Sequence, residues 1–294
     1  MPDYDIVADL PCHVGEGPLW HPDEAALYFT DIPNGKLYRH DPATGDTDTV
    51  YHDARPIGGY TLQQDGSLLL FRDKGNVVTF RDAQVLDTVI DHIPGLESTR
   101  FNDVIADPRG GVFCGTMSSD DVAGRWYYLA PDGTLSQRLD DQGTPNGMGF
   151  SPDRKTLYYQ DSRKATLWAF DYDPQNGQTT NQRALRIASD HDDRGRGDGM
   201  TVDAEGNLWS ARWGGACVLK CTRDGTPVQA YDVPSDAVTS CCFAGPDMTD
   251  LYITSAMGQN RPKSGEYAGS LFKMNLGIKG VEEFRSLVGG AAAS

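Results

Sequence analysis

Residues 146–160, which read NGMGFSPDRKTLYYQ, show the pattern that decides the fold of this chain. One strand-like run leads into the turn Pro152-Asp153-Arg154, and a second run, residues 156–160, follows it. Short runs rich in β-branched and aromatic residues between clusters of turn-forming residues are typical of β-strands. The stretch therefore predicts two strands joined by a tight turn.

The same kind of turn between two strand-like runs recurs along the chain and marks six units. Its occurrences are Pro22-Asp23-Glu24, Gln64-Asp65-Gly66, Pro108-Arg109-Gly110, Pro152-Asp153-Arg154, Ala204-Glu205-Gly206 and Pro246-Asp247-Met248. Residues six positions before the turns are separated by 42, 44, 44, 52 and 42 positions. A period of about 40 to 50 residues with about four strands per unit is typical of a β-propeller.

We therefore predict an all-β fold, a six-bladed β-propeller that forms a single domain over residues 1–288. The early run, residues 4–10, is expected to complete the last blade and close the ring, which removes an open sheet edge. Residues 190–197 form a polar insertion that we expect to be a surface loop. Residues 289–294 are expected to form a flexible C-terminal tail.

The composition argues against several classes of partner. The chain has a net charge of -16, from 26 Lys and Arg against 42 Asp and Glu. Such a surface repels phosphate backbones and anionic lipid, so we expect no nucleic-acid and no membrane partner. No apolar run approaches the roughly 20 residues of a membrane span, and the N-terminus does not resemble a signal peptide. A cytoplasmic location is expected; the oligomeric state is not predicted.

The residues six positions before the turns form the predicted channel lining. In a propeller the first strand of each blade faces the central channel, so these positions form a ring: Glu16, Gly58, Asn102, Asn146, Asp198 and Ser240. Converging carboxylate and carboxamide oxygens suit a hard cation such as Ca²⁺, Mg²⁺ or Mn²⁺. The alternative is a water-filled polar channel whose groups bond one another. Arg100 lies on the same side of its strand as Asn102, and it either points into the channel mouth or forms a salt bridge.

Other constellations point to no competing site. The sequence contains no nucleophile elbow, zincin motif or phosphate-binding loop. We interpret its six cysteines as buried free thiols, although a zinc site at Cys217 and Cys221 or a redox pair at Cys241 and Cys242 stays an alternative. Residues 190–201 resemble a calcium-binding loop only weakly, because Thr201 stands where such a loop has Glu.

Motifs through all six units resemble one known family, that of senescence marker protein 30 (regucalcin), gluconolactonase and aldonolactonase. The resemblance runs from about residue 14 to about residue 285. It is carried by Gly15-Glu16-Gly17-Pro18, Arg100-Phe101-Asn102-Asp103, Pro145-Asn146-Gly147, Asp198-Gly199-Met200 and Gly277-Ile278-Lys279-Gly280, among others.

The resemblance implies a six-bladed propeller with a central divalent metal. It assigns the metal ligands to Glu16, Asn146 and Asp198, gives Asp198 the additional role of catalytic acid and base, and places substrate contacts at Arg100 and Asn102. The position of a further substrate-contacting carboxylate of the family falls on Asp120. The side chain of this residue is one methylene shorter than that of glutamate, and the residue lies in a compressed loop. Gly197 replaces the proline that usually precedes the catalytic aspartate.

The resulting hypothesis is metal-dependent hydrolysis of aldonolactones to sugar acids. Ca²⁺ is the expected ion, with Mg²⁺, Mn²⁺, Zn²⁺ and Fe²⁺ as alternatives, and a sugar lactone is the expected small-molecule partner. The rival hypotheses are a phosphotriesterase-like hydrolase, a calcium-binding propeller without catalysis, and a metal-free propeller similar to strictosidine synthase. The last would leave Glu16 and Asp198 facing each other without a cation.

Overall fold

The computed structural model describes residues 4–187, 194–258 and 260–289, and strands dominate this part of the chain. Its single helix is the four-residue α1 (Arg261–Ser264). No helix in these ranges is long and apolar enough to cross a membrane. Residues 190–193 of the predicted insertion and all of the predicted tail except Gly289 lie outside the described residues. The last two residues of the insertion correct the expectation of a loop, because they begin a strand, β18 (Arg196–Val202).

Four groups of consecutive strands form separate four-stranded antiparallel sheets. The first consists of β2 (Gly15–His21), β3 (Ala26–Asp31), β4 (Lys36–His40) and β5 (Thr47–His52). The second consists of β6 (Ile57–Leu62), β7 (Leu68–Arg72), β8 (Val77–Arg81) and β9 (Gln84–Ile90). The third consists of β10 (Phe101–Ala106), β11 (Val112–Thr116), β12 (Gly124–Leu129) and β13 (Leu135–Gln142). The fourth consists of β14 (Pro145–Phe150), β15 (Thr156–Asp161), β16 (Thr166–Tyr172) and β17 (Thr179–Ile187).

The remaining strands correct the expectation of six separate blades, because they form one eight-stranded sheet. Its members are β18 (Arg196–Val202), β19 (Leu208–Trp213), β20 (Cys217–Cys221), β21 (Pro227–Asp232), β22 (Ala237–Ala244), β23 (Asp250–Ala256), β24 (Leu271–Asn275) and β1 (Asp5–Ala8). The physical reason is one pairing, between Trp213 at the end of β19 and Ala237 at the start of β22. The N-terminal strand β1 pairs with β24.

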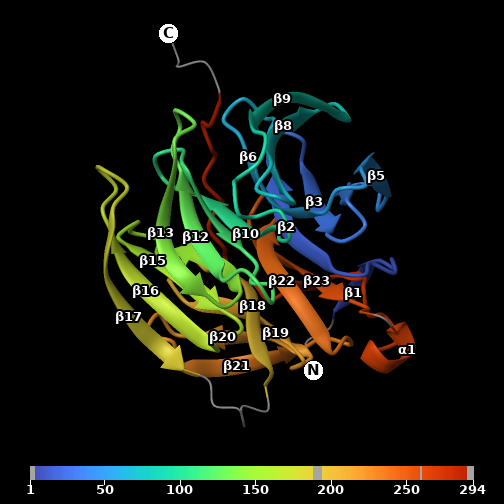
Figure 1. The fold of residues 1–294 in the computed structure, drawn as a ribbon. Coiled ribbons are helices and arrows are strands. Elements are labelled where there is room, and N and C mark those ends of the chain that lie inside the picture. Colours follow the sequence, from blue (N-terminus) through green and yellow to red (C-terminus); the bar gives the residue numbers. More distant parts are fainter. Residues whose placement is uncertain (1–3, 188–193, 259, 290–294) are drawn as a thin grey trace.

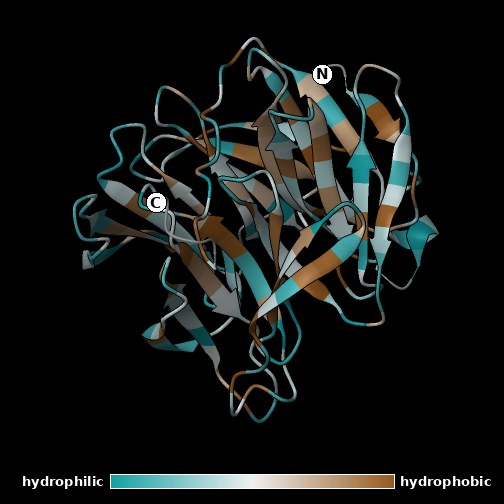
Figure 2. Cartoon of the chain, turned by 90° about the horizontal axis from the view of Figure 1, so that it is seen from above, coloured by the Kyte–Doolittle hydropathy of each residue, from teal (hydrophilic) through white to brown (hydrophobic). Residues whose placement is uncertain are grey.

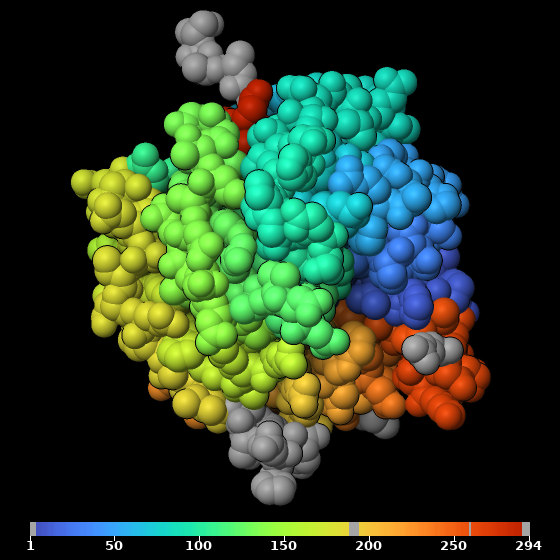
Figure 3. Space-filling view, in the orientation of Figure 1, coloured from blue at the N-terminus to red at the C-terminus, as the bar shows by residue number. Residues whose placement is uncertain are grey.

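The first strands of the successive units surround a central axis. Each contacts the next in the order β2, β6, β10, β14, β18 and β22, and β22 contacts β2 again. Colours therefore follow one another around the molecule in sequence order, and the orange strands β22 and β23 lie beside the blue N-terminal part of the chain (Figures 1 and 3). This propeller-like arrangement agrees with the repeat read from the sequence.

The six turns that reveal the repeat share one backbone conformation. In each, an amide bonds to the carbonyl three residues earlier, as in Arg154 N to Ser151 O at 2.8 Å. The donor has a left-handed backbone in every case: Ala25, Gly66, Gly110, Arg154, Gly206 and Met248. A tight turn that ends in a left-handed residue is a common hairpin connection, and it tolerates residues other than glycine at some cost in strain.

The core lies between neighbouring sheets. Trp20 and Phe29 of the first sheet pack with Tyr252 and Leu271 of the last strands. Phe113 and Trp126 stack at 4.9 Å between ring centroids in a cluster shared by the third and fourth sheets. Hydrophobic and hydrophilic residues alternate along several strands (Figure 2). The six cysteines are buried, as expected, and the described residues contain no disulfide bond.

A segment that the repeat does not contain, residues 279–289, crosses the end of the channel where the first strands finish; we call it the C-terminal strap. Its backbone bonds to the turn regions of several units: Lys279 O accepts from Ala204 N, Gly280 N donates to Met248 O, Ser286 N donates to Leu62 O, and Leu287 N donates to Gly110 O. Arg285 forms an ion pair with Asp23, and Phe284 packs edge-on against Phe150. The strap thereby contacts all six repeat units.

Candidate active site

The ring positions predicted from the repeat lie at irregularities of the innermost strands. In every unit the register between the first and second strands shifts at or beside the ring residue, for example between Glu16 and Leu19 and between Gly197 and Met200. β-Bulges re-aim side chains and are common next to active sites. The bulges explain how residues near the start of each strand can turn toward the axis.

One ring position is glycine for a steric reason. A Cβ atom at Gly58 would lie 1.9 Å from the carbonyl oxygen of Phe101, so no larger residue fits between β6 and β10. A similar restriction applies at Gly197, where a Cβ atom would lie 2.1 Å from Gln160 Oε1. Gln160 therefore fills the space beside the residue that is usually proline in the family, and its Nε2 donates to Asp198 O at 2.7 Å.

Glu16 and Asp198 are two carboxyl groups held near each other at the start of β2 and β18. Burial raises the pKa of Glu16 well above its usual range, and repulsion from Asp198 and Asp103 raises it further. Burial also raises the pKa of Asp198 to about 8, with Asp103 acting in the same direction. The environment therefore disfavours the ionised form of both groups in the absence of a cation.

Asn146 joins Asp198 from the neighbouring strand β14. Its Nδ2 donates to Asp198 Oδ1 and, at 3.0 Å, to Ser162 Oγ. Ser162 Oγ in turn donates to Gly197 O at 2.6 Å. The Asn146 side chain is buried, and its Oδ1 accepts no hydrogen bond from the described residues. One amide oxygen is thus available beside the two carboxyl groups.

Arg100 and Asn102 lie together next to these groups. Arg100 Nη1 donates to Asn102 Oδ1 at 2.9 Å and to Phe101 O at 2.8 Å. Asn102 Nδ2 donates to Pro145 O at 2.6 Å. Burial lowers the pKa of Arg100 to about 10, whereas Glu16 and Asp198 act in the opposite direction. Arg100 therefore supplies positive charge to the site instead of forming a surface salt bridge.

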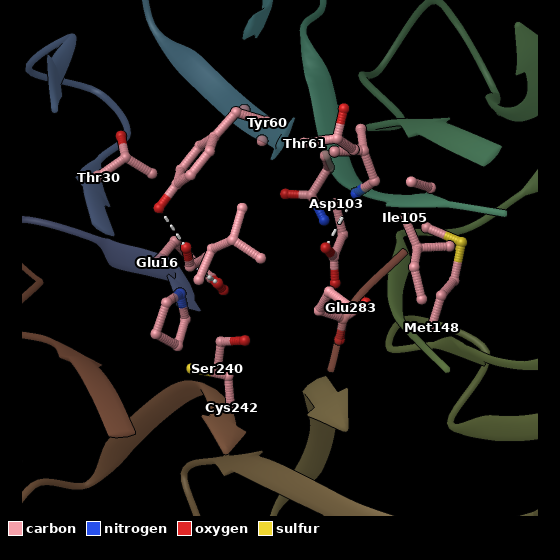
Figure 4. A pocket seen from close by; sticks show the side chains of 18 of the residues that line it. Glu16, Thr30, Tyr60, Thr61, Asp103, Ile105, Met148, Ser240, Cys242 and Glu283 are labelled. Atoms are coloured by element: carbon pink, nitrogen blue, oxygen red, sulfur yellow. Dashed lines mark hydrogen bonds between the residues drawn. The ribbon is translucent and has the colours of Figure 1, made fainter. Parts of the chain in front are cut away.

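A central cavity of about 70 Å³ lies along the channel, and its lining includes Glu16, Asn102 and Asn146. Two further carboxyl groups line it that the sequence reasoning gave no role, Asp103 and Glu283. Figure 4 shows these two side chains pointing toward each other, across the cavity from Glu16. Burial raises the pKa of Asp103 to about 6 and that of Glu283 to about 7.

The sequence carried a signal for only one of these two residues. Asp103 follows a ring residue and belongs to the motif Arg100-Phe101-Asn102-Asp103, so its proximity to the channel could have been anticipated. Its backbone is left-handed, with φ at 56°, and this turns the residue after Asn102 inward as well. Glu283 belongs to the C-terminal strap, which lies outside the repeat, so no periodicity could place it.

Asp120 is not in the hollow that contains Arg100. Arg100 lines a hollow of about 380 Å³ together with Ser118 and Ser119. Asp120 lines a different hollow of about 430 Å³, with Arg163 and Lys164. The two hollows share Ser118 and Ser119, which lie between them. The structure thus brings together Glu16, Asn146, Asp198, Arg100 and Asn102 but leaves Asp120 apart.

The chemistry of the donor set fits a hard divalent cation. Within the described ranges no three His, Cys, Asp or Glu side chains converge as a metal site. The predicted ligand set, however, contains only two residues of these types, Glu16 and Asp198, and its third ligand is the amide of Asn146. Two buried carboxyl groups with raised pKa values and an amide oxygen without a partner are oxygen donors of the kind that calcium and magnesium prefer.

The sequence model of the SMP-30/gluconolactonase/LRE-like region matches residues 14–257. The chain belongs to this family. It is 43% identical over 289 residues to pentonolactonase XacC of Haloferax volcanii, an alignment that covers 95% of this chain and 97% of that protein. It is 35% identical over 280 residues to regucalcin of Xenopus laevis, with 91% and 93% of the two chains covered.

Among solved structures, a calcium-binding protein, regucalcin, of Agrobacterium tumefaciens superposes with a TM-score of 0.88. The two chains are 26% identical, and the superposition covers 97% of each. Membership of the family expected from the motifs is therefore confirmed.

Proposed function

We propose that this protein is a metal-dependent lactonase that opens aldonolactones to the corresponding sugar acids. The observation that carries the proposal is the pair of buried carboxyl groups, Glu16 and Asp198, beside Asn146 and Arg100 at one end of the channel. The similarity to pentonolactonase XacC supports the choice of a sugar lactone as substrate.

Glu16, Asn146 and Asp198 would hold the ion through their side-chain oxygens. A bound divalent cation would polarise the lactone carbonyl and lower the pKa of the carboxyl groups that contact it. Ca²⁺ is the ion we propose, because every donor is an oxygen and a regucalcin of similar fold is a calcium-binding protein. Mg²⁺, Mn²⁺, Zn²⁺ and Fe²⁺ are tested beside it.

Asp198 is the proposed acid and base. Its Oδ1 contacts Asn146, so Oδ2 is the oxygen that would accept a proton from the attacking water. The water oxygen then bonds to the acyl carbon, the bond from that carbon to the ring oxygen breaks, and Asp198 returns the proton to the departing hydroxyl. Arg100 and Asn102 would bind sugar hydroxyls and orient the ring. Asp120 stays a proposed contact at the rim.

The proposal is tested by a pH-stat screen of protein stripped of metal. Xylono-, arabinono-, galactono- and gluconolactone are supplied with each divalent ion in turn, and an organophosphate triester is the comparison substrate. We expect hydrolysis of at least one lactone, lost on chelation and restored by the ion. If no lactone is hydrolysed with any ion, the proposal is wrong; preferential triester hydrolysis would favour the phosphotriesterase alternative.

Two finer structural statements accompany the proposal. We propose that the eight-stranded sheet corresponds to two blades joined through the pairing of Trp213 with Ala237, and that β1 completes the last blade of a six-bladed propeller; the pairings of β19 with β22 and of β1 with β24 support this. We also propose that the protein acts in the cytoplasm.

A further inference from the structure

The hollow above Arg100 is lined mainly by polar side chains, and it lies beside the proposed metal ligands. It measures about 380 Å³, and its walls include Asp73, Glu97, Ser98, Arg100, Ser118 and Ser119. Arg100 connects the hollow to the site, because the charges of Glu16 and Asp198 act on its guanidinium and favour a higher pKa for it. A substrate held by the ion at one end would therefore extend along Arg100 into this hollow.

Asp73 presents a fixed carboxylate to the hollow. Its backbone pairs with that of Arg100 in an isolated β-bridge. Its Oδ1 accepts from Arg55 Nε at 2.7 Å, and its backbone carbonyl accepts from Arg55 Nη2 at 3.3 Å. Oδ2 accepts no hydrogen bond from the described residues. One carboxylate oxygen is thus held by a partner while the other stays available.

Arg100 brings donors to the same hollow. Arg100 uses Nη1 for its bonds to Phe101 and Asn102, and its Nε and Nη2 have no partner among the described residues. A hydroxyl group both donates and accepts, so neighbouring hydroxyls of a sugar can donate to a carboxylate and accept from a guanidinium. Asp73 and Arg100 supply the two halves of such a combination from backbone positions that pair in the isolated bridge.

We propose that Asp73, held by Arg55, is a specificity-determining residue that accepts a hydrogen bond from a hydroxyl of the lactone. The inference rests on the proposed lactonase function and adds a residue that recognises the hydroxyl groups of the substrate. It adds Asp73 to the proposed substrate contacts, on the side of Ser118 and Ser119 opposite to the hollow that Asp120 lines.

The test compares Asp73→Asn with Asp120→Asn and Asp247→Asn in the metal-loaded protein. Asp73→Asn keeps an oxygen for Arg55 but replaces the acceptor Oδ2 by an amide nitrogen. We expect its KM for the preferred lactone to rise about tenfold with kcat changed less than twofold, as for loss of one charged hydrogen bond in binding. The matching deoxylactone, which lacks the hydroxyl, should show no such rise. Asp247→Asn, in an exposed turn, should leave both constants unchanged.

Binding of D-xylonate, measured by saturation-transfer NMR, separates this inference from the lactonase proposal. Weaker xylonate binding by Asp73→Asn supports the inference even if no lactone is hydrolysed. Thermal unfolding identifies a variant that does not fold, in which case Asp73→Ser is used. Unchanged KM and xylonate binding in the folded Asp73 variant, or a rise in KM confined to Asp120→Asn, would overturn it.

Discussion

Asp103 lies close enough to Glu283 to raise the pKa of that carboxyl group, in addition to the larger rise caused by burial. The two residues come from distant parts of the chain, one from β10 and the other from the C-terminal strap. Both line the central cavity with Glu16. The acidic character of the channel thus continues from the proposed metal ligands down to the strap that crosses its far end.

Glu283→Gln should make folding stability less dependent on pH. Glu283 titrates at about 7 in the folded chain against 4.5 for an ordinary Glu, so its protonated form stabilises the folded state. That contribution is complete below pH 4.5 and is lost as the pH rises through about 7. The variant should therefore exceed the parent in free energy of unfolding by about 3 kcal/mol at pH 8 and match it at pH 4.5.

Urea unfolding at the two pH values measures this difference. Glu282→Gln is the matched control, because its exposed neighbouring side chain should not alter the pH dependence. An equal gain at both pH values would show that Glu283 acts through packing and not through its charge.

Asp198→Asn should abolish turnover and weaken metal binding together. The substitution removes the charge of a proposed ligand and the atom that is proposed to move the proton. We expect the rate to fall by about 10³-fold or more and the calcium affinity to fall at least tenfold. Isothermal titration with Ca²⁺ and lactone assays measure the two effects. Asp247→Asn, in an exposed turn, is the control; wild-type turnover by Asp198→Asn would disprove its assigned role.

Ser162→Ala should weaken metal binding without removing a ligand. Ser162 Oγ accepts from Asn146 and donates to Gly197 O, so it fixes the amide and the strand that carries Asp198. Loss of such supporting contacts reduces metal affinity by about 10- to 100-fold. Excess Ca²⁺ should then restore kcat. Ser136→Ala, which removes a hydroxyl far from the ring, should bind as the parent does, and equal affinities of the two variants would contradict the role of Ser162.

A chain that stops after residue 278 should be much less stable. It loses the buried side chain of Val288 and the packing of Phe284 on Phe150, as well as the ion pair of Arg285 with Asp23. Burial of one large apolar side chain contributes about 1.5 to 3 kcal/mol, so we expect a loss of at least about 3 kcal/mol. Thermal unfolding measures it. A chain that stops after residue 289 should melt as the parent does.

The sequence predicted the parts of this molecule that repeat. The six turns and the residues six positions before them occupy equivalent places because one hairpin conformation recurs in every unit. Glu16, Asn146 and Asp198 could therefore be placed near the axis from spacing alone. The family motifs then added roles for Arg100 and Asn102 that spacing does not contain.

What the sequence missed depends on contacts between units or outside the repeat. The pairing of Trp213 with Ala237 merges two units into one sheet and requires two strand ends to meet in space. The position of Asp120 depends on the path of a compressed loop, and counting from Arg100 cannot trace that path. Glu283 and Asp73 reach their places through the strap and through an isolated bridge, neither of which leaves a periodic signal.

The pairing of β1 with β24 has a consequence for how the protein is made. Strand β1 finds its partner only after all the strands between β1 and β24 have been synthesised, and the strap follows later still. Until then the edges of β1 and β23 stay open to pairing with other chains. Formation of this strand pair is thus a late step of folding, and pulse-labelled nascent chains should acquire full protease resistance only after β24 has left the ribosome.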